Sequence, residues 1–427
     1  MELPSNKEED IVIVGGGICG LATALALHRF ETTTSIISQH LTIGCLLNSD
    51  AISLHGFDNY WCVCAHARKL CCRKGIKSVV LERSDSLHYP GAAIAIYANG
   101  WRALDQMGVG TKLRSKAIPL QMKGEFRCLR RRDLIETMAE ALPAGTIRFS
   151  ERVIGVQMDK LTSYSTLHLD DGSTITTKVV IGCDGVNSIV ANSLNLNPPK
   201  LSHIGTLRCV TNYPDEHNYG DAAIRVMKNR LHLGILPIDK NHVLWFISWP
   251  QPPGDSGVIR DPKLLREAAL DQMKDFPPEV IELVNNGDPE SIIYTRVKYR
   301  APWDLLFPSF REGAITVAGD AMHVMGPFMG QGGASAMEDA VVLARCLAQE
   351  MRVGNGSSRQ LQTNIGMALD NYVKERRGRI LRLSIQTYLR QLLQTPVPLV
   401  VKLVVFAISA VLFGKSQNDT QYDCGQL

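Results

Sequence analysis

The sequence predicts an α/β fold in which a Rossmann-like nucleotide-binding domain carries an inserted β-rich lobe and is followed by C-terminal helices. Three observations predict this fold. A short apolar run near the N-terminus leads directly into a glycine-rich turn and an apolar helix. Two later apolar runs end in the pairs Asp184-Gly185 and Gly319-Asp320. Between these pairs, residues 222–250 contain strand-like runs separated by the turn IDKNH.

Length, charge and cysteine content exclude several classes of protein. At 427 residues the chain is long enough for two or three domains. Its formal net charge of +4 is too small and too scattered to indicate a nucleic-acid partner. The polar, acidic start MELPSNKEED has neither the apolar run of a signal peptide nor the basic character of a transit peptide. Because the 11 cysteines are also odd in number, we expect reduced thiols and a cytoplasmic location.

The N-terminal glycine turn has the context that a nucleotide site requires. Ile11 to Val14 form an apolar, β-branched run, and residues 21–27 continue as an apolar helix. Between them, Gly15 makes the turn, Gly17 lets the backbone approach a pyrophosphate, and Gly20 lets the helix pack on the strand. The phosphates would lie on the free amides of the helix N-terminus. We therefore predict a dinucleotide site here.

The second strand of this unit lies unusually far along the chain from the glycine turn. Residues 78–81 are strand-like, and Glu82 is the acid that should follow about 20 residues after the glycine turn. Glu82 instead lies 62 residues after Gly20 (82 − 20), and omitting the 44 residues from 30 to 73 shortens that distance to 18. We therefore interpret residues 30–73 as an atypical surface insertion between the first helix and the second strand.

The insertion has an unusual composition, with five of the 11 cysteines. Its stretch CVCAHARKLCC lacks the paired CxxC spacing of zinc sites, so no metal site is predicted. Arginine stands at each boundary of the segment, at Arg29 and Arg73, where either codon could be divided by a splice site. A translated intron is therefore one hypothesis, and a genuine structural element is the other.

Two further strand-and-turn motifs follow along the chain. Residues 179–182 form an apolar run before Asp184, Gly185 and Ser188. Residues 314–318 form another before Asp320, which is followed by a proline, a glycine-rich turn and a helix reaching Cys346. Taken singly, such motifs are usually ordinary turns. In this order, after GxGxxG and an acid-terminated strand, they are far more specific.

Together these motifs resemble the para-hydroxybenzoate hydroxylase class of flavin-dependent monooxygenases, most of all its plant branch near zeaxanthin epoxidase. The resemblance extends from residue 11 to about 346 and implies an FAD-binding domain of the glutathione-reductase type. It implies that the GxGxxG turn holds the FAD pyrophosphate, that Glu82 holds the adenosine ribose, and that Asp184 contacts both FAD and NAD(P)H. Asp320 would bind the ribityl or ribose side. The cofactor-binding residues implied are Gly15, Gly17, Gly20, Glu82, Arg83, Arg131, Asp184, Gly185, Asp320, Pro327, Gly330, Gly332, Gly333 and Ala334.

Some positions depart from the family pattern. The segment 117–126 is shorter than the strand-forming stretch usual before the R-x-x-L helix, which begins here at Arg131. Arg130 and Arg132 flank that arginine, so a solvated basic face is an alternative to a flavin contact. Ala191 and Ala334 stand where the family often has arginine and asparagine. The insertion and the short segment are the departures that bear on catalytic competence.

The chain divides into three predicted parts. Residues 1–190 and 301–350 form the FAD-binding domain, residues 191–300 the substrate lobe, and residues 351–427 C-terminal helices with an apolar tail. In the lobe, Trp245, Phe246 and Trp249 are interpreted as packing residues rather than a cavity lining. The apolar run at 397–413 is either a packed terminal helix or a contact with a membrane surface.

The resemblance implies an NAD(P)H- and FAD-dependent monooxygenase. Such an enzyme transfers one oxygen atom of O₂, through a flavin hydroperoxide, to a small organic substrate of aromatic or isoprenoid type. NAD(P)H would visit only transiently, so no second GxGxxG is needed. The cofactor performs the chemistry, so no catalytic side chain is predicted. Two alternatives remain open: a non-oxygenating flavin oxidoreductase of the same fold, and a catalytically inactive splice product.

Overall fold

The computed structural model describes most of the chain outside the predicted insertion. The described residues are 6–29, 77–89, 91–159, 162–228, 230–250, 261–352, 358–395, 397–413 and 417–427. Residues 30–73 lie outside them, so the surface position of that segment and its lack of a metal site stay predictions. The six cysteines in the described part are free and buried.

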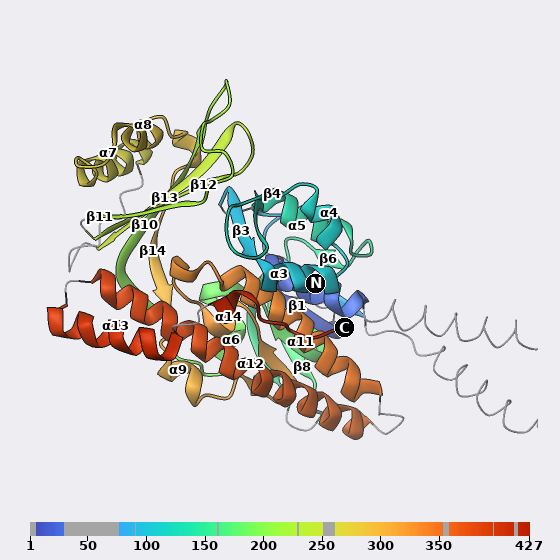
Figure 1. Cartoon of the computed structure of the whole chain (residues 1–427). Helices are drawn as coiled ribbons and strands as arrows, with labels where there is room; N and C mark the ends of the chain where they lie inside the picture. Colours follow the sequence, from blue (N-terminus) through green and yellow to red (C-terminus); the bar gives the residue numbers. More distant parts are fainter. Residues whose placement is uncertain are drawn as a thin grey trace, which may run out of the picture.

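The first sheet has eight strands and forms the nucleotide-binding core (Figure 1). Its central path runs β15-β16-β9-β1-β2-β6, and β7 and β8 extend it from β9. Ile11, Val12 and Ile13 of β1 are fully buried, as expected for a strand covered on both faces. The strands are β1 (Asn6–Val14), β2 (Ser78–Leu81), β6 (Ile147–Arg148), β7 (Val153–Met158), β8 (Ser165–Leu169), β9 (Thr174–Gly182), β15 (Arg311–Glu312) and β16 (Ile315–Val317).

Parallel pairing brings the ends of four strands to one edge of this sheet. Val14 of β1 is opposite both Leu81 of β2 and Gly182 of β9, and β16 runs parallel to β9. The backbone N–H of Gly15 donates to Leu81 O at 2.8 Å. The predicted pairing of the first two strands is therefore confirmed, although 63 residues separate Val14 from Ser78 (78 − 14 − 1).

The second sheet is antiparallel and forms the β-rich lobe. Its order is β11-β12-β13-β10-β14, and two helices, α7 (Pro262–Gln272) and α8 (Pro278–Asn285), cover one face. Trp245 and Trp249 pack into that covered face, as predicted, whereas Phe246 points to the opposite face beside Gly234. The strands are β10 (Lys200–Asn212), β11 (Ile224–Lys228), β12 (Leu231–Pro237), β13 (His242–Pro250) and β14 (Ile293–Tyr299).

A small third sheet, β3-β5-β4, lies between the first sheet and the lobe. Tyr97 of β3 stacks on Phe126 of β5 with ring centroids 4.3 Å apart, and both pack against Leu244 of the lobe. The short segment 117–126 supplies the two-residue strand β4. The elements here are β3 (Ala93–Tyr97), α3 (Ala98–Gln106), α4 (Gly110–Arg114), β4 (Ile118–Pro119), β5 (Phe126–Arg130) and α5 (Arg131–Glu140).

The C-terminal helices are part of the first core rather than an appendage. Ile365, Leu369 and Tyr372 of α12 are fully buried in the same apolar cluster as β1. Of the predicted domain boundaries, 190 falls inside α6 and 350 inside α11, and the three-part division stays a proposal. The elements are α6 (Ile189–Ser193), α9 (Trp303–Leu306), α10 (Asp320–His323), α11 (Gly332–Arg352), α12 (Ser358–Gln394), α13 (Leu399–Phe413) and α14 (Gln417–Thr420).

The apolar tail helix α13 packs on α12 through the buried side chain of Val405 but leaves many apolar side chains exposed. At 15 residues it is about 22 Å long, short of the roughly 30 Å of a bilayer core. None of the other described helices carries a membrane-spanning apolar run either. Its exposed apolar side chains are Leu399, Val400, Val401, Leu403, Val404, Phe406, Ile408 and Val411.

Candidate functional site

The glycine turn after β1 forms an open cradle. Gly15 has φ +102°, and a Cβ there would lie 2.6 Å from Cys183 O. A Cβ on Gly20 would lie 1.9 Å from Gly15 O, because the helix of residues 18–29 begins tightly against the turn. A Cβ on Gly17, by contrast, would meet no atom within 4 Å. Gly15 and Gly20 therefore shape the turn, and Gly17 faces the space that a pyrophosphate needs.

Glu82 closes this turn from the second strand. Its Oε2 accepts from the Gly16 N–H at 2.7 Å, and its Oε1 accepts from the Ser84 N–H at 2.9 Å. Each oxygen keeps a lone pair free, so the carboxylate can hold the turn and still accept from a ribose hydroxyl. Arg83 beside it is exposed.

The two carboxylate oxygens of Asp184 have different surroundings. Its Oδ2 accepts from the N–H of Ile189 at 2.7 Å, at the start of α6, whereas its buried Oδ1 has no partner in the described structure. Burial raises the pKa of Asp184. Gly185 has φ +77°, and a Cβ there would meet nothing within 4 Å. The unpartnered oxygen beside an open glycine fits a ligand hydroxyl or amide.

Asp320 begins α10 at the end of β16 and belongs to the same edge of the sheet. Its side chain keeps solvent-accessible surface although protein surrounds it, which describes a residue at the base of a cleft. Burial raises the pKa of Asp320, while the neighbouring His323 and Arg131 act in the opposite direction. No protein hydrogen bond engages its carboxylate in the described structure, so the carboxylate can serve a ligand.

Arg131 is the cleft-facing member of its arginine triplet. Arg130 pairs with Asp239 at 2.5 Å, and Arg132 pairs with Glu136 at 2.8 Å, both toward solvent. Arg131 instead has a buried Nε without a partner in the described structure. Burial lowers the pKa of Arg131, whereas the negative charge of Asp320 acts to raise it. The structure therefore favours the cleft position over a solvated basic face for this one residue.

The loop from Pro327 to Ala334 forms another wall of the cleft. Pro327 and Gly330 keep exposed surface between buried neighbours, and Gly330 adopts the left-handed conformation with φ +62°. Gly332 starts α11 with open space at its Cβ position, whereas a Cβ on Gly333 would lie 2.9 Å from Ile94 of β3. Ala334 is only 3% exposed, and its methyl group faces α3, so only its backbone could reach a cofactor.

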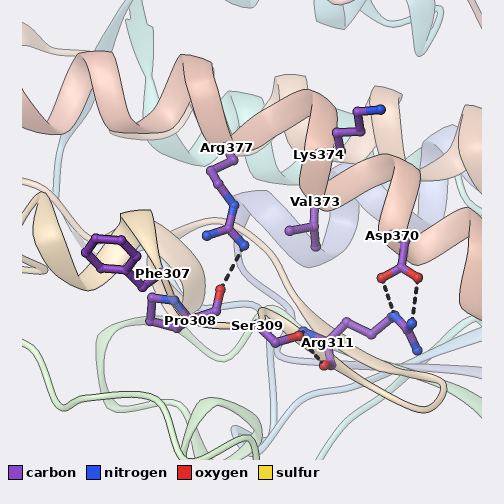
Figure 2. Close-up of a pocket in the computed structure, with 8 residues that line it drawn as sticks. All are labelled: Phe307, Pro308, Ser309, Arg311, Asp370, Val373, Lys374 and Arg377. Carbon is purple, nitrogen blue, oxygen red and sulfur yellow. Dashed lines mark hydrogen bonds and ion pairs between the residues drawn. The ribbon is translucent and has the colours of Figure 1, made fainter.

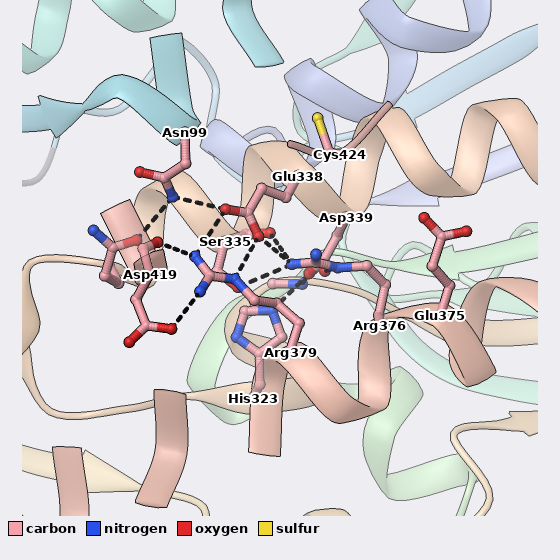
Figure 3. A network of polar contacts seen from close by, with 12 residues as sticks. Asn99, His323, Ser335, Glu338, Asp339, Glu375, Arg376, Arg379, Asp419 and Cys424 are labelled. Atoms are coloured by element: carbon pink, nitrogen blue, oxygen red, sulfur yellow. Dashed lines mark hydrogen bonds and ion pairs between the residues drawn. The ribbon is translucent and has the colours of Figure 1, made fainter. Parts of the chain in front are cut away.

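The sequence interpretation missed the buried polar network that supports Asp320 (Figure 3). Asp339 of α11 accepts from the Gly319 N–H at 2.9 Å and contacts His323 Nε2 at 2.6 Å through the same oxygen. Its other oxygen accepts from Arg376 of α12 at 2.7 Å, and Arg376 also pairs with Glu338 at 2.7 Å. This network holds the turn that presents Asp320. The only sequence signal was the acidic pair Glu338-Asp339 between apolar residues of the helix α11.

One hollow on the described surface lies elsewhere (Figure 2). It has a volume of about 410 Å³ and is bounded by α12 and the Phe307–Arg311 turn. Arg311 pairs with Asp370 there at 2.6 Å, and Arg377 donates to Pro308 O at 2.8 Å. None of the predicted site residues lines it, so the cleft at the sheet edge remains the functional candidate.

The site combines the open glycine turn after β1 with two carboxylates, Asp184 and Asp320, that can accept hydrogen bonds from a ligand. Together with the β-rich lobe, these features define a nucleotide-dependent oxidoreductase of the flavoprotein class. Residues 129–383 match the family described as "FAD binding domain". The chain is 40% identical to Monooxygenase 1 of Arabidopsis thaliana, over 99% of this chain and 100% of that protein. The chain therefore belongs to this family of FAD-dependent monooxygenases.

Solved structures agree on the fold. HpxO of Klebsiella pneumoniae, in its complex with FAD and uric acid, superposes with a TM-score of 0.72 over 98% of each chain at 19% identity. A salicylate hydroxylase substrate complex gives 0.68 over 98% of this chain and 97% of that one, at 18% identity. These likenesses show the α/β fold with an antiparallel lobe. They do not show the narrower placement near zeaxanthin epoxidase, which stays a proposal.

We expect Asp320→Ala to weaken FAD binding without unfolding the protein. The carboxylate makes no hydrogen bond within the described structure, so its loss leaves no protein donor unpaired and removes only a neighbouring negative charge from Arg131. One hydrogen bond from a charged group contributes about 1.5–3 kcal/mol, which corresponds to roughly a 10- to 100-fold higher Kd for FAD. Fluorescence titration of FAD into apoprotein measures the change. Asp339→Asn is the matched control: it should lower stability as well, and precipitation of Asp320→Ala would contradict the assignment.

Proposed function

We propose that this protein is an NAD(P)H-dependent FAD monooxygenase that inserts one oxygen atom of O₂ into a small organic substrate, with aromatic compounds as the favoured class. The observation that carries the proposal is the set of available groups at the carboxyl edge of the first sheet. This edge offers an open pyrophosphate cradle at Gly17, an Asp184 oxygen without a partner in the described structure, and an exposed Asp320 carboxylate. The uric acid and salicylate chemistry named for the two superposed enzymes supports an aromatic substrate.

The residues present fit FAD at this site. Amides at the start of helix 18–29 would hold its diphosphate, and Glu82 and Asp320 would accept from its hydroxyls. When bound, FAD accepts a hydride from NAD(P)H and mediates oxygen transfer from O₂. Arg131 would supply positive charge beside Asp320. Leu244 of the lobe packs with Phe126 of the third sheet, and Phe328 packs with the lobe strands β10 and β14; these apolar contacts would keep bulk water away from the site.

Two alternatives are separated from this proposal by direct measurements. Purified protein containing FAD in a one-to-one ratio would exclude an inactive splice product. Turnover with NAD(P)H under ¹⁸O₂, followed by mass spectrometry, separates an oxygenase from a non-oxygenating oxidoreductase. One ¹⁸O atom per product molecule is the expected result. Cofactor oxidation without labelled product would overturn the monooxygenase assignment. An isoprenoid substrate, as the zeaxanthin epoxidase resemblance would imply, is the second class to screen.

Excising residues 30–73 should preserve or improve FAD binding and solubility. The strands on either side already pair in register without any described contribution from that segment. Lengthening a connection costs only about 0.6 kcal/mol per doubling, so about four doublings amount to roughly 2 kcal/mol. Thermal unfolding and FAD titration of the shortened chain measure both effects. Failure of that chain to fold, or a metal bound by Cys62, Cys64, Cys71 and Cys72 of the full chain, would identify a genuine structural element instead.

The exposed apolar surface of α13 supports a second proposal, that residues 397–413 contact a membrane surface. Val411 is 83% exposed, Leu399 is 72% exposed, and the helix is too short to span a bilayer. Co-sedimentation with phosphatidylcholine vesicles should be lost when Leu403 and Phe406 are both replaced by serine. Equal recovery of both proteins in the supernatant would contradict this contact.

A further inference from the structure

Residues 419–427 lie across three helices of the FAD-binding part, and we call this segment the strap (Figure 1). Asp419 and Cys424 are each only 2% exposed, so the strap is anchored in the protein interior at both positions. Arg345 of α11 donates to Cys424 O at 2.6 Å. The helix residues that bond the strap are Arg102 and Gln106 of α3, Arg345 of α11, and Arg379, Arg382 and Gln386 of α12.

Asp419 connects the strap to the buried polar network of the two long helices. Its Oδ1 accepts from Arg379 Nη1 at 3.1 Å and from Arg382 Nε at 2.9 Å. Its Oδ2 accepts from Gln386 Nε2 at 2.5 Å, and its backbone carbonyl accepts from Arg379 Nη2 at 2.5 Å. Both oxygens of the carboxylate are therefore bonded to α12.

Asp419 also supplies a charge that this network needs. Three arginines of α12 belong to the network, but α11 supplies only two carboxylates. Asp419 is the third carboxylate, and it bonds two of the three arginines. Because a buried guanidinium without a counter-charge is costly, the network depends on the strap. The arginines are Arg376, Arg379 and Arg382, and the carboxylates of α11 are Glu338 and Asp339.

Arg379 links Asp419 to the glycine-rich loop through two further side chains (Figure 3). Its Nη2 donates to Glu338 Oε1 at 3.2 Å, and its Nε donates to Glu338 Oε2 at 3.3 Å. Glu338 Oε1 also accepts from Asn99 Nδ2 of α3 at 2.7 Å, and the same Nδ2 donates to Gln331 Oε1 at 2.8 Å. Because an amide nitrogen carries two N–H groups, Asn99 can make both bonds at once and couples Glu338 to Gln331.

Gln331 belongs to the loop 327–334 that forms one wall of the candidate FAD site. It is only 1% exposed, and it lies between Gly330, which has φ +62°, and Gly332, which has open space at its Cβ position. Its Nε2 is buried and has no partner in the described structure, so this N–H group can donate to a ligand. The bond to Asn99 fixes this amide and the loop around it.

We propose that Asp419 is a positioning residue for FAD, which holds the loop 327–334 in its cofactor-binding conformation through the hydrogen-bonded path that ends at Gln331. The inference rests on the FAD site described above. It assigns a part in that site to a segment outside residues 129–383, which match the family. Coupling between two sites is reciprocal, so FAD binding should in turn stabilise the strap.

Titration of FAD into the full-length apoprotein, followed by flavin fluorescence, tests the proposal. Asp419→Asn should raise the Kd for FAD about tenfold, because it removes the charge that balances two arginines of α12. Gln386→Leu removes one bond to Asp419 and leaves every charge in place, so it should raise the Kd about threefold. Asp423→Asn is the matched control and should keep the wild-type Kd, because Asp423 is an exposed strap carboxylate that bonds the Gly425 N–H at 2.9 Å.

Hydrogen exchange gives a readout that a purely structural strap would not change. Exchange of the backbone amides of residues 419–427, measured by mass spectrometry, should slow when FAD is added to the wild-type apoprotein. The amides of α7 and α8 are the internal reference, because these helices pack on the lobe sheet and report any general stabilisation. The slowing in the strap should exceed that of the reference and should be lost in Asp419→Asn.

Three results would overturn the proposal. These are an unchanged Kd in both Asp419→Asn and Gln386→Leu, an equal rise of the Kd in Asp423→Asn, and strap exchange that FAD slows no more than the reference. If circular dichroism shows that Asp419→Asn is unfolded, the Kd of Gln386→Leu and the exchange of the wild-type protein decide.

Failure of the proposed function would have a different signature. A wild-type protein that binds no FAD would refute the cofactor site itself. Oxidation of NAD(P)H without ¹⁸O incorporation would refute the monooxygenase function and leave the positioning role of Asp419 standing.

Discussion

Gly17→Asp should yield a folded protein that no longer binds FAD. A side chain at this position meets no protein atom within 4 Å, so the substitution leaves the core undisturbed. It does place a carboxylate in the space that faces the helix N-terminus, where the pyrophosphate would lie. The introduced carboxylate and the pyrophosphate would repel each other, and the free amides would donate to the aspartate instead. We expect FAD affinity to fall below detection.

The neighbouring glycines supply the controls for this experiment. Gly20→Ala should unfold or precipitate the protein, because its Cβ would lie 1.9 Å from Gly15 O. Gly17→Ala adds bulk without charge and should weaken FAD binding less than the aspartate does. Flavin absorbance after purification and circular dichroism of each variant separate loss of cofactor from loss of fold. Wild-type FAD affinity in a folded Gly17→Asp protein would remove the basis for the whole site.

Arg376→Met should destabilise the protein by about 3–5 kcal/mol, the usual consequence of removing one partner from a buried ion pair. Arg376, Glu338 and Asp339 are all fully buried, and the guanidinium bonds both carboxylates (Figure 3). Burial alone raises the pKa of Asp339, but His323, Arg376 and the Gly319 N–H bring it below its ordinary value. Its contribution is thus present at neutral pH and fades as the pH falls below about 4.

Urea unfolding followed by circular dichroism measures this effect, with Arg377→Met as the control. Arg377 is the next residue of α12, but it donates to the backbone carbonyls of Leu305, Leu306 and Pro308 near the surface. Its loss should cost roughly 1–2 kcal/mol. Equal midpoints for the two variants would show that the network under Gly319 is not a major source of stability. Because Asp339 also holds the turn before Asp320, Arg376→Met should weaken FAD binding as well.

The predictable part of the site consists of residues whose roles are set by nearby backbone. Gly15 needs a positive φ, Gly20 a close approach, and Glu82 and Asp320 follow directly on buried strands, so short motifs reveal them. Parallel strands bring their carboxyl ends to one edge whatever lies between them. For that reason the pairing of β1 with β2 could be predicted across a long atypical segment.

Tertiary structure alone decided which member of an arginine run faces the cleft and which distant charges meet. Arg130 to Arg132 look alike in the sequence. Arg132 pairs locally with Glu136, four residues on in the same helix, but only the tertiary position of Asp239 turns Arg130 to solvent. Arg148 of β6 pairs with Glu9 of β1, which lies 139 residues earlier in the chain. Asp339 and Arg376 likewise pair across two helices. No local pattern encodes such pairs, because they depend on sheet register and on the path of α12, which the packing of the whole core determines.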